Sequence, residues 1–455
     1  MNIGVIGGAG YVGLVTGLGF AELGHHVTSV DVNEERIKRL QSGQTPIHEE
    51  GLLPVLERNL GDGNIEFSTS FPDAVEGQDV VFIAVGTPAQ DDGQADLSQV
   101  IEVAERLVDL MESYTVVVIK STVPVGTVEL VQSILNREKA EGMDFDIVSN
   151  PEFLREGKGM IDFFYPDRIV VGTRSERARE AMHELYRPLI AGNIAETTGR
   201  APLPADIAPE ERPVPLVETD LASAQMIKYA SNAFLATRIS FINEIARLCE
   251  EVDANINEVA RGMGYDPRIG SSYLDAGLGF GGPCLEKDLK ALIKIAEAND
   301  YEPRLLREVL GRNDQQVREV IGKVKELTGY LLYKKIVAVW GLAFKSGTND
   351  VRNSLAFRVV EALEREGAEV QAHDPMALDE ARALHPNIHY FDDPYEAAAN
   401  ADAVVLATDW PQYAELDFDE VKRRMARPAI VDGRNLLDRD MLMTEGFRYL
   451  SMGRA

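Results

Sequence analysis

The chain has 455 residues, of which 74 are acidic and 46 are basic, and its formal net charge is -28. This length favours two or three domains at about 150 residues each, so every domain can bury its own core. So acidic a balance argues against nucleic acid or an anionic membrane as a partner. Arginine outnumbers lysine, and an acid-rich, lysine-poor surface would suit a cytoplasm with high salt.

The cysteine content indicates a reducing compartment. The chain contains two cysteines, Cys249 and Cys284, which excludes a disulfide scaffold. The N-terminal residues carry no basic region before an apolar run, and no apolar run approaches the about 18 residues of a membrane span. We therefore expect a cytoplasmic protein with no membrane partner. Cys249 lies in an apolar helical pattern, and we expect it to pack in a core.

The first element is a short buried strand, Asn2–Ile6, followed by a glycine-rich turn and a helix that runs to about Leu23. The turn has the pattern G-x-G-x-x-G, in which glycines let the backbone approach a pyrophosphate at the positive end of the helix. A second strand, His26–Val30, ends in Asp31, 23 residues after Gly8, where a carboxylate can bind the adenosine ribose and repel the extra phosphate of NADP. The combination predicts an NAD site that includes Gly8, Gly10, Tyr11, Val12, Gly13 and Asp31.

Polar turns follow the next two strands, at residues 79–85 and Thr115–Ile119. In a doubly wound sheet, ligands lie beyond the carboxyl ends of the strands. We therefore expect Thr87, Ser121 and Thr122 to face the cofactor or the substrate. The alternative is that these hydroxyls only cap the helices that follow.

A strand at residues 146–149 leads into the segment N-P-E-F-L-R-E-G, residues 150–157. If this segment is helical, Glu152 and Glu156 project from one face and form a pair of carboxylates. The alternative is that both are ordinary solvated acids of an acidic protein.

Residues 199–215 contain five prolines and no helical or strand period, which predicts a surface loop at the edge of a domain. We then expect Thr219 to cap a helix of about 30 residues. Apolar residues surround much of this helix, which indicates a spine between domains that also contacts a partner subunit. Lys228 and Asn232 share one of its faces, where a lysine among alanines and aromatics indicates a function. The alternative is a lysine that reaches out to solvent.

Residues 279–288, G-F-G-G-P-C-L-E-K-D, place Cys284 in a glycine-rich loop at the start of a charged helical run. Lys287 and Asp288 follow within one turn and can shift the thiol pKa or manage protons. This arrangement indicates a nucleophile, and the alternative is a small buried apolar residue.

The last segment alternates strands and helices again, with strands at 335–340, 369–373, 403–407 and 429–431. It lacks G-x-G-x-x-G, and the basic residue Lys345 after its first strand suits the phosphates of a nucleotide-bearing substrate. We predict an α/β protein with two Rossmann-like, doubly wound parallel-sheet domains joined by a long central helix. The expected parts are an NAD-binding domain (1–198), a proline-rich loop (199–217), a helical linker and dimerisation domain (218–328) and a Rossmann-like domain for the nucleotide-bearing substrate (329–455).

Six motifs in order make the chain resemble the UDP-glucose 6-dehydrogenase family, one of the nucleotide-sugar dehydrogenases. They read G-A-G-Y-V-G, S-T-V-P-V-G-T, N-P-E-F-L-R-E-G, K-Y-A-S-N-A-F-L-A-T-R-I-S-F-I-N-E, G-F-G-G-P-C-L-E-K-D and G-L-A-F-K, and they extend nearly end to end. The resemblance implies that two NAD+ in succession oxidise UDP-glucose to UDP-glucuronate, without release of the aldehyde. Cys284 would form a thiohemiacetal and then a thioester that water cleaves. Lys228 would stabilise the oxyanion, assisted by Asn232.

The resemblance also assigns the remaining site residues. Asp288 and Glu156 match carboxylates tied to proton transfer and to the hydrolytic water, with Thr122 positioning that water, and it stays open which one is the base. Arg268 matches an arginine that reaches across from a neighbouring subunit, which implies a homodimer or a higher homo-oligomer. No metal is expected. Further cofactor contacts are Arg36, Glu152, Lys287 and Arg352, and further substrate contacts are Glu152, Phe153, Leu154, Tyr273, Gly279, Phe280, Gly281, Lys345 and Arg434.

Two features depart from the family pattern. The loop usually reads G-G-S-C-F-P-K-D, whereas this chain has Pro283, Leu285 and Glu286, which bears on the shape and charge of the sugar pocket. The 199–215 segment is also longer than expected. Rival functions are the same reaction on UDP-N-acetylmannosamine or GDP-mannose, and a non-catalytic NAD-binding sensor. Pro283 in place of a histidine before the cysteine favours glucose, and a sensor would need none of the catalytic residues.

Overall fold

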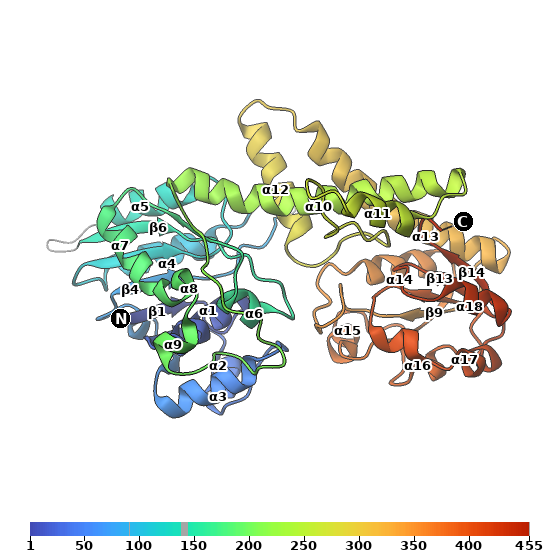
Figure 1. Cartoon of the computed structure of the whole chain (residues 1–455), viewed down its shortest axis with the longest axis horizontal. Helices are drawn as coiled ribbons and strands as arrows, with labels where there is room; N and C mark the ends of the chain where they lie inside the picture. Colours follow the sequence, from blue (N-terminus) through green and yellow to red (C-terminus); the bar gives the residue numbers. More distant parts are fainter. Residues whose placement is uncertain (91, 138–143, 455) are drawn as a thin grey trace. The chain divides into compact units, whose positions relative to one another are not determined.

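The computed structural model describes residues 1–90, 92–137 and 144–454. The chain forms two compact units, Met1–Ala230 and Ser231–Ala455. Figure 1 colours the first unit from blue to green and the second from green to red. The boundary falls inside one helix, α10 (Leu221–Glu251), so α10 contributes residues to both units.

The sheet of the first unit has the strand order β3-β2-β1-β4-β5-β6-β7-β8. Its first six strands follow the doubly wound order 3-2-1-4-5-6 and are parallel. The seventh strand pairs antiparallel with β6, and β8 runs parallel to β7. The strands are β1 (Asn2–Ile6), β2 (His26–Val30), β3 (Ile65–Ser68), β4 (Val80–Ile83), β5 (Thr115–Ile119), β6 (Phe145–Ser149), β7 (Ile169–Gly172) and β8 (Leu216–Thr219).

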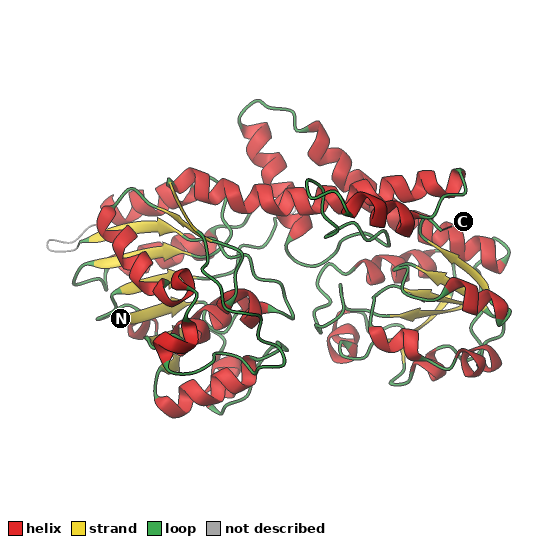
Figure 2. Cartoon of the chain, viewed as in Figure 1, coloured by secondary structure: helices red, strands yellow, loops and turns green. Residues whose placement is uncertain are grey.

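Side chains along these strands alternate between two hydrophobic cores, as the period of a β-strand requires. In β4, Val80 and Phe82 pack in a core with Leu14, whereas Val81 and Ile83 pack in another with Val103. Both faces of the sheet are therefore covered by helices, as Figure 2 shows. The helices are α1 (Tyr11–Glu22), α2 (Glu34–Gln41), α3 (Leu52–Asp62), α4 (Ser98–Val108), α5 (Thr127–Arg137), α6 (Gly159–Phe164), α7 (Glu176–Leu185), α8 (Arg187–Ala191) and α9 (Ile194–Thr198).

The second unit contains a fully parallel sheet of order β11-β10-β9-β12-β13-β14. Its strands are β9 (Ile336–Trp340), β10 (Glu369–His373), β11 (His389–Tyr390), β12 (Ala403–Leu406), β13 (Ala429–Asp432) and β14 (Arg448–Ser451). Trp340 is fully buried in its core and stacks on Tyr413, with ring centroids 5.4 Å apart. The helices are α11 (Ile256–Gly264), α12 (Leu285–Ala298), α13 (Arg304–Thr328), α14 (Leu355–Arg365), α15 (Leu378–Leu384), α16 (Pro394–Ala397), α17 (Phe418–Arg424) and α18 (Arg439–Thr444).

Two Rossmann-like sheets with a long helix between them confirm the expected fold class. One detail was wrong, because Thr219 does not cap the long helix. Thr219 ends β8, and the side chain of Asp220 accepts a hydrogen bond from the backbone N–H of Ser223 at 2.9 Å. Asp220 directly precedes the helix, and aspartate is at least as good an N-cap as threonine, whereas Thr219 is the last residue of the strand.

The proline-rich segment between α9 and β8 has neither helix nor strand, as expected. It is nevertheless anchored to the first unit. Leu203 and Val214 are buried in the core around α1. The guanidinium of Arg200 forms ion pairs with Glu22 at 3.1 Å and with Asp62 at 2.6 Å. Two apolar side chains and an arginine therefore hold this segment against the first unit.

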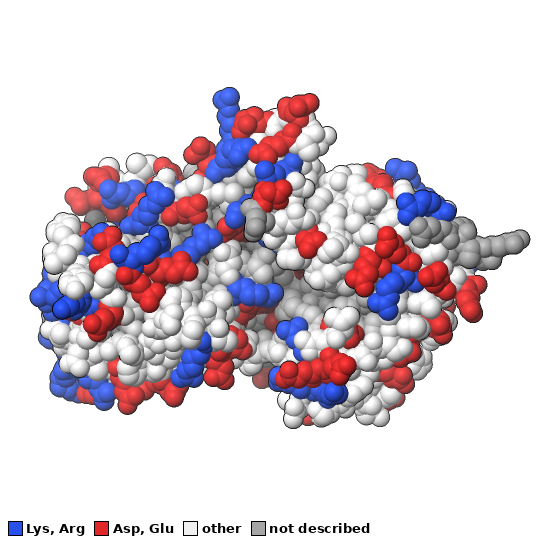
Figure 3. All heavy atoms as spheres, turned by 180° about the vertical axis from the view of Figure 1, so that it is seen from behind, with Lys and Arg blue, Asp and Glu red and all other residues white. Residues whose placement is uncertain are grey.

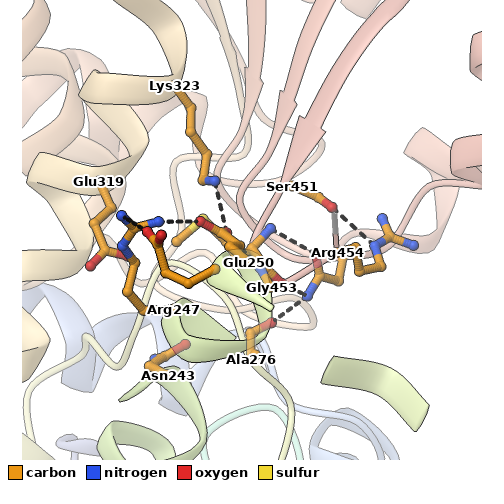
Figure 4. A network of polar contacts seen from close by, with 12 residues as sticks. Asn243, Arg247, Glu250, Ala276, Glu319, Lys323, Ser451, Gly453 and Arg454 are labelled. Atoms are coloured by element: carbon orange, nitrogen blue, oxygen red, sulfur yellow. Dashed lines mark hydrogen bonds and ion pairs between the residues drawn. The ribbon is translucent and has the colours of Figure 1, made fainter. Parts of the chain in front are cut away.

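A polar network around Glu250 connects α10, α13 and the C-terminal residues of the second unit (Figure 4). The Glu250 carboxylate binds Lys323 Nζ at 2.8 Å and Arg247 at 3.1 Å, and it accepts the backbone N–H of Gly453 at 2.7 Å. Burial alone would raise the pKa of Glu250, but Lys323, the Gly453 N–H and Arg247 outweigh burial and lower it. The carboxylate is thus held in its charged form.

The charge of the chain is spread over its surface. On the face drawn in Figure 3, red acidic side chains are interspersed with blue basic ones in both units. Many of these charges form ion pairs within one helix, such as Lys38 with Glu34. None of the helices in the described ranges has the length and hydropathy needed to cross a bilayer.

Candidate active site

The turn between β1 and α1 has the shape that a diphosphate requires. Gly7 adopts a φ of +86°, and a Cβ atom there would lie 2.7 Å from the carbonyl oxygen of Ala84. A Cβ on Gly13 would lie 2.2 Å from the Gly7 carbonyl oxygen, so the helix packs directly on the turn. Gly10 is the N-cap of α1 and has no side chain, so the first-turn amides of α1, at Tyr11 and Val12, stay available to an anion. These residues therefore fit NAD.

Asp31 lies at the edge of this turn, after β2. One carboxylate oxygen accepts the N–H of Ala9 at 3.1 Å, and the other accepts the N–H of Asn33 at 2.9 Å. A carboxylate can accept about four hydrogen bonds, so it retains capacity for ribose hydroxyls. Arg36, five residues after Asp31, is exposed on α2.

The corresponding carboxylate of the second sheet, Asp374 after β10, is used differently. It is buried and accepts five hydrogen bonds, among them those of Leu342 N–H at 2.7 Å and Trp410 Nε1–H at 3.2 Å. Its lone pairs are therefore occupied by the protein itself. This explains in physical terms why the second sheet does not repeat the NAD site of the first.

The hydroxyls beyond β4 and β5 connect neighbouring loops. Thr87 Oγ1 donates to the carbonyl oxygen of Thr122 at 2.8 Å, and Ser121 Oγ donates to that of Val85 at 2.6 Å. Both side chains are buried, whereas Thr122 is half-buried. The three residues do lie at the carboxyl edge of the sheet, where the prediction placed them.

Residues 150–157 form a loop, so the condition for a helical pair of carboxylates is not met. Pro151 lies two residues after the end of β6, and Gly157 adopts a φ of +83°, which does not suit a helix. Glu49 holds the loop by accepting the N–H of Gly159 at 2.8 Å. Burial, Glu49 and Glu156 all raise the pKa of Tyr11. A Cβ on Gly159 would lie 2.5 Å from Tyr11 Oη, so the chain just after this loop packs against the first residue of α1.

Glu152 and Lys228 form a buried ion pair, with Oε1 and Nζ 2.9 Å apart. Burial alone would raise the pKa of Glu152, but the Lys228 ammonium and the N–H of Leu154 lower it. Lys228 therefore does not reach out to solvent, and its buried charge has a partner. Phe153 lies beside the pair, 5.4 Å from Lys228 Nζ, with Arg168 stacked on its ring at 3.6 Å.

A second buried lysine, Lys120, was not predicted. Its Nζ donates to Asn150 Oδ1 at 3.0 Å and to Tyr186 Oη at 3.3 Å. Burial lowers the pKa of Lys120 to about 8, Glu152 raises it and Lys228 lowers it further. The sequence offered one signal, a lysine that ends an apolar strand at the carboxyl edge of a doubly wound sheet.

In the second unit, Asp288 is the centre of a buried cluster. Its side chain is 1% exposed, one oxygen accepts Asn232 Nδ2–H at 2.6 Å, and the other accepts Lys287 Nζ at 2.6 Å. Asn232 comes from α10, one helical turn after Lys228. The structure thus brings together two of the predicted groups, Glu152 with Lys228 in the first unit and Asn232, Asp288 and Lys287 in the second.

Cys284 is the N-cap of α12, and its side chain is exposed. Its carbonyl oxygen accepts the N–H of Asp288 at 2.9 Å, so the cysteine starts the helix that carries Asp288. A helix N-terminus favours a thiolate over a thiol. Cys249 is buried in the core with Ile242 and Ala246, as expected.

Glu286, one of the departures from the family pattern, points into the protein. Its carboxylate accepts Lys290 Nζ at 2.6 Å, Asn353 Nδ2–H at 2.9 Å and Arg358 Nη2–H at 2.6 Å. Burial alone would raise the pKa of Glu286, but these partners outweigh burial and lower it.

The predicted substrate contacts occupy different environments. Phe280 is buried in a small core with Ala233 and Leu289, and its backbone is bound on both sides by Asn313. Arg434 donates to the carbonyl oxygens of Ala407 and Gly279, and burial lowers its pKa. The other predicted substrate contacts have these positions: Gly281, Leu154 and Tyr273 are half-buried, Lys345 is half-buried beside the ring of Phe344, and Arg268 is exposed and paired with Asp266. Arg352, predicted as a cofactor contact, is exposed and paired with Asp350.

Three family models match the chain. They describe the UDP-glucose/GDP-mannose dehydrogenase family, with its NAD-binding domain at residues 1–190, its central domain at 222–315 and its UDP-binding domain at 338–439. The UDP-glucose 6-dehydrogenase of Rhizobium meliloti is 46% identical over 450 residues, which cover 98% of each chain. One from Bacillus subtilis is 42% identical over 448 residues, 98% of this chain and 92% of that one.

Solved structures agree with these relatives. A UDP-glucose dehydrogenase from the hyperthermophilic archaeon Pyrobaculum islandicum superposes with a TM-score of 0.88 at 38% identity, covering 100% of this chain and 98% of that one. The UDP-D-ManNAc dehydrogenase from Pyrococcus horikoshii gives a TM-score of 0.85 at 28% identity, with coverage of 100% and 99%. Because the models of the NAD-binding, central and UDP-binding domains match in this order along the sequence, the chain belongs to the UDP-glucose/GDP-mannose dehydrogenase family.

Proposed function

We propose that this NAD-dependent oxidoreductase converts UDP-glucose to UDP-glucuronate in a four-electron oxidation. The observation that carries the proposal is a cluster in which buried Asp288, on the helix that Cys284 begins, accepts hydrogen bonds from Lys287 and from Asn232 of α10. A scaffold or sensor that only binds NAD gains nothing from burying two charges beside a helix with an exposed thiol at its end. Two curated relatives, 46% and 42% identical to this chain, are named UDP-glucose 6-dehydrogenases, which supports glucose as the sugar.

The chemistry is divided among residues of this chain. The turn of Gly8 to Gly13 would hold two NAD+ molecules in succession, and each would supply the hydride acceptor for one of the two oxidations. After the first oxidation, the Cys284 thiolate adds to the aldehyde carbon, and the oxygen becomes the alkoxide of a thiohemiacetal. Lys228 stabilises this oxyanion with Asn232, and loss of one such donor typically costs about 3 to 4 kcal/mol. After the second oxidation, water attacks the thioester carbon and the thiolate leaves.

Proton transfer is assigned to Asp288 and Glu156, with Thr122 positioning the water. The Asp288 carboxylate accepts from an ammonium and from an amide, so it has a proton donor at hand in Lys287. Glu156 lies in the loop just before the chain that packs against the first residue of α1. Asp288→Asn and Glu156→Gln separate the roles, because only the variant that lacks the hydrolytic base accumulates the thioester, which intact-protein mass spectrometry detects.

The direct test is an NADH assay with a panel of nucleotide sugars. We expect two NADH per UDP-glucose consumed, with UDP-glucuronate as the product. Absence of turnover with every UDP-hexose, at low and at high salt, would refute the proposal. The second candidate, oxidation of UDP-N-acetylmannosamine, is favoured by the similarity to the Pyrococcus horikoshii enzyme. Higher kcat/KM for that sugar than for UDP-glucose would establish it.

We further propose that the enzyme is a cytoplasmic homodimer whose domains have the limits given by the sequence. Support for the dimer comes from α10, where Phe234, Phe241 and Leu248 are exposed at a spacing of seven residues, which places them on one face. Phe234 is 61% exposed. A second copy of this chain could cover such a stripe and bring Arg268 to a neighbouring site. Sedimentation of the wild type and of Phe234→Glu tests this, since a monomeric wild type would contradict it.

A further inference from the structure

Residues on both sides of Cys284 are held by one neighbouring segment of the second unit. Two residues before the cysteine, the N–H of Gly282 donates to the carbonyl oxygen of Asn353 at 3.2 Å. The side-chain amide of Asn353 donates back to the Gly282 carbonyl oxygen at 3.3 Å and to Glu286 at 2.9 Å. Asn353 therefore contacts the chain two residues before and two residues after the nucleophile.

The backbone around Asn353 lies directly against the loop that contains Cys284. Asn353 adopts a left-handed conformation, with a φ of 51°. A Cβ on Gly281 would lie 2.7 Å from the Asn353 carbonyl oxygen, so the two segments are in direct backbone contact. Ser354 then caps α14 by accepting the N–H of Ala356 at 3.2 Å. The start of α14 is thereby joined to the loop that precedes α12.

Glu286 poses an electrostatic problem for a thiolate. It lies in the first turn of α12, two residues after Cys284, and its carboxylate is 10% exposed. An uncompensated negative charge there would disfavour a second negative charge on sulfur. Three groups compensate it: the cations of Lys290 on α12 and Arg358 on α14, and the amide of Asn353. Arg358 is oriented in turn by Asp314 on α13 at 3.0 Å.

We propose that Glu286, Asn353 and Arg358 form a clamp that positions the Cys284 loop and keeps its thiolate reactive by neutralising the acid in the first turn of α12. In this clamp Glu286 is a positioning residue and Arg358 its counter-charge. The proposal rests on Cys284 being the nucleophile of the proposed function. It goes beyond that function because it assigns a role to Asn353 and Arg358, to which the proposed function gives none.

The clamp makes different predictions for the loss of its two charged members. Arg358→Met leaves the Glu286 carboxylate undercompensated, so the pKa of the Cys284 thiol rises. Glu286→Gln keeps the side-chain shape and the hydrogen bond from Asn353 but removes the negative charge, so the thiol pKa does not rise. In the double variant Glu286→Gln/Arg358→Met, the thiol pKa returns to the wild-type value. A purely structural ion pair predicts instead that both single variants act alike.

The experiment measures alkylation of Cys284 by iodoacetamide between pH 6 and 10, followed by mass spectrometry of the Cys284 peptide. Arg358→Met should slow alkylation at pH 7 by about two- to fivefold, a range expected for one charge in a partly solvated site. Arg358→Lys should restore the wild-type rate. Arg365→Met is the matched control, because it removes an exposed arginine two turns along the same helix, and it should change nothing.

Equal slowing in Arg358→Met and Glu286→Gln, or no slowing in either, would overturn the proposal. If Arg358→Met does not fold, Lys290→Met takes its place, since it removes the other cation beside Glu286. Alkylation needs neither NAD nor sugar, so it separates the two proposals. If the alkylation rates change as expected but no nucleotide sugar is turned over, the clamp is supported and the proposed function is refuted. If UDP-glucose is turned over but no variant changes the alkylation rate, the proposed function is supported and the clamp is refuted.

Discussion

Cys284 has two properties that a covalent catalyst needs, exposure and a place at a helix N-terminus. A serine in its place is a poor nucleophile towards an aldehyde at neutral pH and cannot form a thioester. We expect Cys284→Ser to stop after at most the first oxidation, with complete turnover reduced by at least about a thousandfold. Counting NADH and product per UDP-glucose checks this. Two NADH per sugar at an undiminished rate would contradict the thioester route.

Lys120 is the residue that pattern reasoning missed, and the reason is physical. A lysine after a strand usually reaches solvent, and only the fold shows that its Nζ turns inward to Asn150 and Tyr186. By contrast, Glu152, Lys228, Asn232 and Asp288 were predicted as site residues, and two contacts join them in pairs. A sequence motif shows which residue types occur at a site. It does not show which side chain pairs with a buried charge, because that partner comes from elements distant in the sequence.

The titration of Lys120 gives a prediction for stability. Burial lowers its pKa to about 8 in the folded protein, whereas an unfolded lysine titrates near about 10.5. Between these values the unfolded chain binds more protons than the folded one, so stability contributed by this group rises with pH. We expect the thermal midpoint of the wild type to rise relative to that of Lys120→Met from pH 8 to pH 10.

Lys38→Met serves as the comparison for Lys120→Met, since Lys38 is 72% exposed on α2. Its difference from the wild type should stay constant over the same pH range. Scanning calorimetry or fluorescence melting provides both series. A Lys120→Met difference that is equally flat would mean that Lys120 titrates as a solvated lysine, contrary to its burial.

At the scale of elements, hydrophobic period and glycine position predicted most of what was found. The strands β1, β2, β5 and β10 were placed with their observed limits, and others with errors of one or two residues. Neither β7 nor β8 was expected from the sequence, so the antiparallel pairing of β7 with β6 was not predicted either. Local sequence indicates that a strand forms, but its direction is set by the neighbours available at the sheet edge.

Glu250 joins three elements of the second unit, so its loss should affect them together. Glu250→Gln removes the charge that Lys323 and Arg247 share, at a cost of roughly 1.5 to 3 kcal/mol of unfolding free energy at neutral pH. Because its folded pKa is lowered, the stabilisation is present above the unfolded pKa and is lost as pH falls through the folded pKa. The wild type and the variant should therefore converge in acid.

Hydrogen exchange locates the effect of Glu250→Gln. The Gly453 N–H donates to Glu250, so exchange at residues 451–454 should accelerate in the variant while that of β1 and β4 in the first unit should not. Glu251→Gln is the matched control, because Glu251 is 60% exposed and pairs with Arg247 on the same helix. Equally faster exchange in both variants would show that the network around Glu250 stabilises the C-terminal residues no more than the exposed ion pair of Glu251 with Arg247 does.

At the scale of the whole molecule, the net charge of -28 means that attraction within surface ion pairs competes with repulsion among the surplus carboxylates. Salt weakens the surface ion pairs, which lowers stability, and it also screens the repulsion among surplus carboxylates, which raises stability. Exposed pairs contribute about 0 to 1 kcal/mol each, so the surplus of 28 charges should dominate. We expect the thermal midpoint to rise with KCl, most steeply below about 0.5 M, where the screening length shortens most.

The sign of this salt dependence decides whether the acidic surface suits a high-salt cytoplasm. A rising midpoint together with activity retained in about 2 M KCl and lost on dialysis to about 20 mM would fit that habitat. Melting in sodium sulfate at equal ionic strength distinguishes charge screening from strengthened burial of apolar surface. Both salts screen charges, but sulfate also strengthens apolar burial, whereas chloride hardly does. A midpoint that falls as KCl rises would mean that the ion pairs outweigh the repulsion, and the acidic composition would then carry no adaptation to salt.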